Sequence, residues 1–381
     1  MIFKQKTILL ILILISISGF LKAQSPYAIK TVDTLSSPYF WGRGYAKNGM
    51  GKAAHFIAEE MIKIGLQPFT ENFFQSFYIS TNIFEKSVNL KINGKRIKAG
   101  KDFIVKASSP TLKGKFKLNK IDEKNYKDPK NKISITKTNK LTWSPASQLD
   151  SIVQIYLKDT SNMDLTKAKI NLKQEFKKDF EVKNVCGFIT GTVYPDSFLV
   201  LTAHYDHLGG LGKHTYFPGA NDNASGTALL LELAGYYVLH PPKYSVAFLA
   251  FGAEEIGLKG SKYFVEHPLI SLEKIKFLLN LDLMGNGKEG ITVVNASGHP
   301  NQFQSLVAWN KTKGRFKDIK FRENAANSDH YPFTQKGVPA FFIYTLGGNP
   351  AYHDIYDISK TLTLKYFPDL ELMIQDFFNT F

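Results

Sequence analysis

Histidines and carboxylates follow several of the most apolar segments of this sequence. The run FLVL, residues 198–201, leads into His204, Asp206 and His207, and a glycine-rich segment, GANDNASG, contains Asp222. Three further apolar runs lead to polar groups: VAFLAF to Glu254 and Glu255, FLLNL to Asp282, and PAFFIYTL to Tyr352 and His353. Imidazoles and carboxylates hold divalent metal ions and move protons, so the pattern indicates a metal site or an acid–base site.

The elements that would position these groups alternate between strands and helices from residue 184 onward. Apolar strands are predicted at VCGFITG, SFLVLTA, SVAFLAF, IKFLLNL, ITVVNA and PAFFIY, and helices at GTALLLELAGYYVL, NQFQSLVAWNKTKG and YFPDLELMIQDFF. This alternation predicts an α/β fold with a mostly parallel central sheet and helices on both faces. Because ligands bind at the carboxyl ends of such strands, the polar groups are expected to converge there.

The residue types of this set suit zinc or a related divalent ion. Two histidines and three carboxylates without a thiolate provide more ligands than one tetrahedral zinc requires. If one carboxylate is shared between two ions, each ion has three protein ligands and an open position. Two ions about 3.5–4 Å apart can then hold both an attacking water and a substrate oxygen.

Five motifs in one order resemble those of peptidase family M28, the zinc aminopeptidases that use co-catalytic metals. The motifs are AHYDHLG, GANDNASG, FGAEEIGLKGS, NLDLMG and AYHDIYD. The segments LSSPYFWGRG and GMGKAAHFIAEEMIKIGLQPF also resemble the opening of that family. The resemblance covers residues 36–78 and 184–381 and implies the zinc-dependent exopeptidase fold.

The resemblance assigns a role to each residue of the motifs. It implies that His204 and Asp282 bind one metal, that Glu255 and His353 bind the other, and that Asp222 bridges them.

Three further residues are implied as catalytic. Glu254 is expected to be the general base, and Asp206 to hydrogen-bond the far nitrogen of His204. Tyr352 is expected to donate a hydrogen bond to the developing oxyanion.

Three other polar residues have two open interpretations each. His207 is either a group that supports the metal ligands or an ordinary loop histidine. Asp329 and His330, in NSDHYPF, either line the substrate pocket or belong to a capped turn.

Residues 80–183 differ in composition from the segments around them. Short alternating stretches rich in lysine, such as VNLKING and DFIVKASS, predict a β-rich inserted segment between two parts of a catalytic domain, residues 24–79 and 184–381. The insertion is expected to leave the main sheet intact and to shape the entrance to the site. Within the first part, Ala53, Ile57, Met61 and Ile64 lie at helical spacing, and Gly65 ends the predicted helix.

The first 23 residues have the pattern of a signal peptide. Lys4 and Lys6 precede an uncharged run from Ile8 to Leu21, which is short for a bilayer span of roughly 20 residues. A secreted or periplasmic protein is therefore expected, with an uncleaved N-terminal anchor as the alternative. Cys186 is the one cysteine of the sequence, and its apolar surroundings favour a buried, inert thiol.

The formal net charge of +15 is high. The lysines alternate with apolar residues between positions 86 and 183, which favours a solvated β-rich surface over a nucleic-acid-binding face. The expected partner is a peptide substrate.

Three functions fit the resemblance. The first is an exported exopeptidase, most simply an aminopeptidase with two zinc ions. The second is a single-zinc glutaminyl cyclase, and the third is a receptor-like relative without activity. The first is favoured because GANDNASG, all five ligand residues and Glu254 are present.

Overall fold

The structure is a computed structural model that describes residues 25–159, 164–348 and 350–381. The predicted signal peptide lies outside the described residues. The main sheet has nine strands, eight of them in the following order: β1 (Gln67–Pro68), β12 (Glu175–Ile189), β16 (Tyr244–Phe251), β13 (Tyr194–His204), β17 (Ile275–Leu281), β20 (Ala340–Leu346), β18 (Gly290–Val294) and β19 (Ile319–Arg322). The ninth, β2 (Phe74–Ile83), pairs with β12.

The centre of this sheet is parallel, but the sheet as a whole is mixed. β13 runs parallel to β16 and β17, and β17 runs parallel to β20. β12 is antiparallel to β16, and β18 is antiparallel to β20. The prediction of a mostly parallel sheet is therefore wrong.

The reason lies in two short connections. Residues 190–193 join β12 to β13, and residues 282–289 join β17 to β18. β16 lies between β12 and β13, and β20 lies between β17 and β18. A strand that re-enters the sheet in the parallel direction needs a crossover of a dozen or more residues, so strands joined by these shorter loops run in opposite directions.

Helices cover both faces of the sheet, as the alternating apolar strands predicted. Leu199, Leu201 and Ala203 of β13 face a core shared with several helices, whereas Phe198 and Val200 face the opposite core. The helices on the first face include α2 (Pro26–Leu35), α3 (Gly49–Ile64), α4 (Gly226–Leu239), α6 (Pro300–Lys313) and α8 (Phe367–Phe378). The helices on the second face are α5 (Lys259–Glu266) and α7 (His330–Gln335).

The predicted helix ending at Gly65 is confirmed as α3, and Gly65 has the left-handed conformation of a helix C-cap. Cys186 is fully buried, and burial raises the pKa of its thiol. The short helical turns are η1 (Pro38–Arg43), η2 (Ala220–Ser225), η3 (Leu272–Lys274), η4 (Ala296–Gly298) and η5 (Ser359–Thr361). Within the described residues, no helix combines the length and the apolar character needed to cross a membrane.

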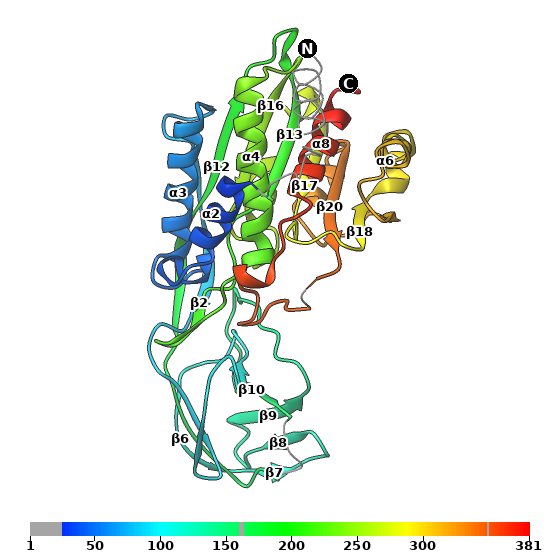
Figure 1. The fold of residues 1–381 in the computed structure, drawn as a ribbon. Coiled ribbons are helices and arrows are strands. Elements are labelled where there is room, and N and C mark those ends of the chain that lie inside the picture. The colour runs from blue at the N-terminus through cyan, green and yellow to red at the C-terminus, as the bar shows by residue number, and fades with distance from the viewer. Residues whose placement is uncertain (1–24, 160–163, 349) are drawn as a thin grey trace, which may run out of the picture.

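The lysine-rich segment forms two sheets of its own at one end of the molecule (Figure 1). One sheet contains β4 (Lys95–Ile97), β3 (Val88–Ile92), β11 (Lys167–Leu172) and β6 (Leu112–Lys117). The other contains β5 (Phe103–Val105), β10 (Val153–Lys158), β9 (Ile133–Thr138), β8 (Asn125–Lys127) and β7 (Asn119–Lys120). The boundaries expected at residues 80 and 183 fall within β2 and β12, which connect this region to the main sheet.

The core of this region continues into the loop that follows His204. Leu208, Leu211 and Phe217 of that loop are buried in the same apolar cluster as the inserted strands. The rings of Trp143 and Phe217 are stacked with their centroids 5.2 Å apart. The loop also forms a small hairpin, β14 (Gly210–Leu211) and β15 (Thr215–Tyr216).

Candidate metal centre

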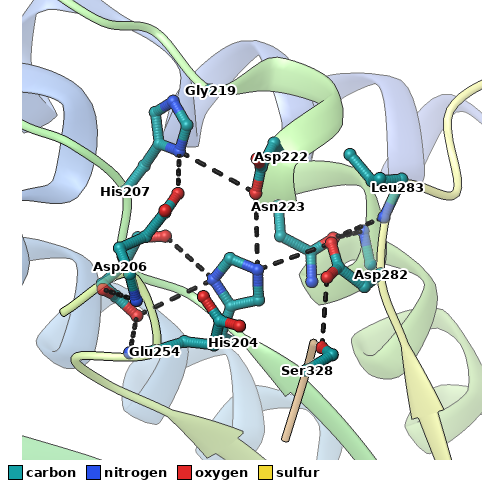
Figure 2. A network of polar contacts seen from close by, with 12 residues as sticks. His204, Asp206, His207, Gly219, Asp222, Asn223, Glu254, Asp282, Leu283 and Ser328 are labelled. Atoms are coloured by element: carbon teal, nitrogen blue, oxygen red, sulfur yellow. Dashed lines mark hydrogen bonds and ion pairs between the residues drawn. The ribbon is translucent and has the colours of Figure 1, made fainter. Parts of the chain in front are cut away.

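His204, Asp222 and Asp282 form one compact group of possible metal ligands. The Nε2 atom of His204 is 3.4 Å from Asp222 Oδ1 and 3.4 Å from Asp282 Oδ1. Figure 2 shows one nitrogen of the His204 ring facing both carboxylates. All three side chains are buried, so their charges interact in an environment with little water.

Glu255, His353 and His207 approach Asp222 from the other side. His353 Nε2 is 3.3 Å from Asp222 Oδ2 and 3.1 Å from Glu255 Oε2. His207 Nδ1 is 2.6 Å from Glu255 Oε1, and His207, Asp222 and Glu255 also form a compact group of possible ligands. Asp222 therefore belongs to both groups, in the position of a shared carboxylate.

The parallel part of the sheet explains why these residues meet. His204 is the last residue of β13, and Asp282 directly follows β17. Glu255 follows β16, and His353 follows β20 through a loop. Because these four strands are parallel, their carboxyl ends lie at one edge, and the η2 turn before α4 brings Asp222 to the same edge.

The electrostatics of the centre favour positive charge between the carboxylates. Burial alone would lower the pKa of His204, but the carboxylates of Asp282 and Glu254 raise it well above its usual range. Burial likewise opposes the charge of His353, yet Glu255 and Asp222 raise its pKa to about 11. Burial and Asp222 would raise the pKa of Glu255, but the imidazoles of His353 and His207 lower it to about 2.

The donor set fits a divalent metal such as zinc. Asp282 Oδ1 and His207 Nε2 are buried without a hydrogen-bond partner among the described residues, and buried polar atoms normally have one. Imidazole nitrogens and carboxylate oxygens are ordinary zinc ligands, at about 2.0–2.2 Å from the ion. A cation placed among these atoms would satisfy the unpaired oxygen of Asp282.

Glu254 differs from its neighbour Glu255 because it belongs to neither ligand group. Burial raises the pKa of the Glu254 carboxyl well above its usual range, and although His204 opposes this shift, the carboxylate of Asp329 adds to it. A carboxylate with a raised pKa beside a metal centre can exchange protons with a bound water or substrate.

Asp206 supports this region differently from the sequence-based expectation. The Nδ1 atom of His204 lies 3.2 Å from the main-chain oxygen of Asp206 and 3.7 Å from its carboxylate. The carboxylate instead accepts hydrogen bonds from the backbone N–H groups of Glu254, at 3.0 Å, and Glu255, at 3.4 Å. Asp206 therefore orients the Glu254–Glu255 segment as well as contacting His204.

A cavity of about 290 Å³ opens onto the centre. The residues that line it are His204, Asp222, Glu254, Glu255, Asp282, Leu283, Arg322, Asn327, Phe342, Tyr344, Tyr352 and His353. Tyr352 is 46% exposed, and its ring stacks on His353 with the centroids 4.0 Å apart. Asp329 and His330 are fully buried and do not line the cavity, whereas Asn327 of the same segment does.

The sequence profile of peptidase family M28 matches residues 184–376, which include every residue of the two ligand groups. The chain belongs to peptidase family M28. Aminopeptidase YwaD of Bacillus subtilis is 33% identical over 168 residues, covering 42% of this chain and 34% of that protein. The match therefore spans about a third of that relative's length.

Solved structures share the fold of this family member over nearly its whole length. An M28 peptidase precursor from Shewanella amazonensis has a TM-score of 0.71 at 13% identity, covering 94% of this chain and 93% of that one. A zinc aminopeptidase from Bacillus subtilis has a TM-score of 0.68 at 20% identity, covering 93% and 94%. At these identities the likeness concerns the fold alone.

Two residues that hold the loop between β13 and α4 in this M28 chain were not singled out from the sequence. Arg43 is fully buried and donates to the main-chain oxygens of Leu35, Tyr205, Pro218, Gly219 and Asp222. The carboxylate of Asp357 accepts from the backbone N–H groups of Asn221 and Asp222. Both lie in motifs quoted for the family resemblance, and the signal that could have found them is a charged residue within a glycine-rich or aromatic motif.

The inserted region also contacts a residue of the metal centre. Ser144 Oγ is 3.3 Å from His353 Nδ1, and the backbone N–H of Trp143 donates to the main-chain oxygen of His353 at 3.0 Å. Because Nδ1 faces Ser144, Nε2 is the nitrogen that faces Asp222 and Glu255.

Proposed function

We propose that this protein is a zinc-dependent aminopeptidase that removes N-terminal residues from peptides with the help of two zinc ions. The observation that carries the proposal is the pair of ligand groups that share Asp222, with Glu254 beside them and outside both. In this assignment His204 and Asp282 hold one ion. Glu255 and His353 hold the other, because His353 Nε2 is 3.1 Å from Glu255 and 3.3 Å from Asp222, although the compact group around Glu255 contains His207 in its place. His207 contacts Glu255 and would hold the carboxylate of that ligand in place.

Bound zinc would supply a Lewis acid that activates water and polarises the scissile carbonyl group. Glu254 would accept the proton of the attacking water and pass it to the leaving amine. Asp206, through the two backbone N–H groups, would keep Glu254 aimed at the cavity. Tyr352, at the rim of the cavity, would donate its hydroxyl proton in a hydrogen bond to the developing oxyanion.

Two further points belong to the proposal. Residues 1–23 would direct export, so the protein would act in the periplasm or outside the cell. The part of the inserted region between β9 and β10 would border the entrance, since Trp143 and Ser144 contact His353. This arrangement would limit which peptides reach the metals.

The test is a panel of aminoacyl p-nitroanilides assayed with the metal-free protein and with zinc added in steps. Release of p-nitroaniline that rises to two zinc equivalents supports the proposal. Cyclisation of an N-terminal glutamine peptide at one equivalent, without p-nitroaniline release, would instead identify a glutaminyl cyclase. Zinc binding with neither reaction would point to a non-enzymatic relative.

A further inference from the structure

The cavity over the metal centre carries opposite charges on different walls. Asp222, Glu254, Glu255 and Asp282 supply carboxylates. The described lining contains one Lys or Arg side chain, that of Arg322 at the end of β19. Because the proposed metals occupy most of these carboxylates, the guanidinium is the charged group of the lining that remains for an anionic group of a ligand.

Arg322 is exposed, and one side chain accepts a hydrogen bond from its guanidinium. Its Nη1 atom donates to the hydroxyl of Tyr344 at 3.3 Å, and Tyr344 lies on β20. Among the residues that the structure describes, no carboxylate forms an ion pair with this guanidinium at 4.0 Å or less. A guanidinium has five donors in a planar fork that matches a carboxylate, so most of its capacity stays open.

The neighbouring walls suit the side chain of one amino acid. Leu283 and Phe342 add apolar surface to the cavity, and Asn327 adds an amide. Leu283 directly follows Asp282, so this surface begins at the metal centre itself. A side chain that starts at the scissile residue would pass apolar surface before it meets a charge.

We infer that Arg322 binds the side-chain carboxylate of substrates whose N-terminal residue is aspartate or glutamate. The inference rests on the proposed aminopeptidase function and names its substrate class. The side-chain carboxylate would form charge-assisted hydrogen bonds with the guanidinium. A lysine side chain would be repelled, and glutamine would fit without the ionic interaction.

The experiment compares glutamyl and glutaminyl p-nitroanilides, which differ in charge and hardly in size. With the zinc-loaded protein, kcat/KM for the glutamyl substrate should exceed that for the glutaminyl one by about 10-fold or more. In Arg322→Gln this ratio should fall toward one, mainly through the glutamyl substrate. In Arg322→Glu a lysyl substrate should become preferred. Arg315→Gln is the matched control, because Arg315 is paired with Asp369 and does not line the cavity.

Two further arms separate the sources of the carboxylate and the two proposals. If Arg322→Gln impairs cleavage of the dipeptide Ala-Ala but leaves the glutamyl p-nitroanilide unaffected, the guanidinium binds a C-terminal carboxylate and the inference is overturned. If all substrates are inert, the aminopeptidase proposal fails, and calorimetry with L-glutamate and L-glutamine then decides on Arg322 alone. Tighter glutamate binding that is lost in Arg322→Gln supports the inference, and equal binding of both amino acids overturns it.

Discussion

Glu254 and Glu255 are adjacent in the sequence but have different neighbours. Glu255 contacts the imidazoles of His207 and His353, whereas Glu254 stands outside both ligand groups. We therefore expect Glu254→Gln to keep its zinc and to lose turnover by at least ~10²-fold, the lower end of what a positioned acid–base group contributes. Glu255→Gln should lose one zinc ion together with turnover. Zinc stoichiometry by elemental analysis, combined with steady-state kinetics, measures both effects.

The control for this pair is Glu266→Gln, an exposed glutamate at the end of α5, which should change neither zinc content nor turnover. Equal zinc loss in the Glu254 and Glu255 variants would show that both residues are ligands. Near-normal turnover in Glu254→Gln would remove Glu254 from the chemistry.

The residues of the centre were predictable to different degrees. His204 and Asp282 follow apolar strands directly, so the pattern of strand ends indicates them. The contact between His207 and Glu255 joins positions 48 residues apart. It depends on the direction of side chains in a loop, and the periodicity of a sequence does not predict that direction.

At the scale of elements, the loop from β13 to α4 depends on Arg43. Its guanidinium is fully buried, and burial lowers its pKa to about 10, although nearby carboxylates oppose the shift. We expect Arg43→Lys to destabilise the fold by about 3 kcal/mol or more, since an ammonium cannot donate to five carbonyl groups in a planar fork. Zinc affinity should fall as well, because Arg43 anchors the main-chain oxygen of Asp222.

Urea denaturation and zinc competition titrations measure these two effects of Arg43→Lys. The matched control is Arg96→Lys in β4, an exposed arginine outside the loop, which should stay within about 0.5 kcal/mol of the parent protein. Parent-like stability of Arg43→Lys would mean that water or a rearranged loop replaces the lost donors.

The inserted region contributes to the proposed zinc site through Ser144, which contacts His353. Ser144→Ala removes the partner of His353 Nδ1, and this contact fixes the orientation of the imidazole ring. The affinity for the zinc ion bound by His353 should therefore fall about 10-fold. Thr142→Ala, an exposed change in the same segment, should leave zinc affinity unchanged. Competition with a chromophoric chelator reads the affinity directly. An unchanged affinity in Ser144→Ala would limit the role of this segment to the backbone contact of Trp143.

Elements were easier to predict than the directions in which they run. The predicted strands at SFLVLTA, SVAFLAF and IKFLLNL are present as β13, β16 and β17, because long apolar runs mark buried strands. An apolar run does not indicate, however, whether its strand runs parallel or antiparallel to the neighbouring strands. The mixed sheet follows from the lengths of the loops at 190–193 and 282–289. These short loops were the feature of the sequence from which the strand directions could have been predicted.

At the scale of the whole molecule, the metal centre concentrates buried negative charge at one edge of the main sheet. Asp282 and Glu254 lie there beside Asp222 and Glu255, and burial together with the neighbouring carboxylates raises the pKa of both groups, so their charges act against folding when no cation is bound. Zinc should therefore stabilise the fold as a ligand of the native state, by about 2.7 kcal/mol at a free concentration of 100 times its Kd. Differential scanning calorimetry should show a higher Tm with zinc and a lower one with a chelator.

The variant Asp282→Asn should differ from the parent protein in opposite directions under these two conditions. Without zinc it should melt at or above the Tm of the parent protein, because one repelling charge is gone. With zinc it should melt below the Tm of the parent protein, because one ligand is lost. A Tm that is the same with and without zinc in the parent protein would mean that the carboxylates are already compensated by the imidazoles of His204, His207 and His353.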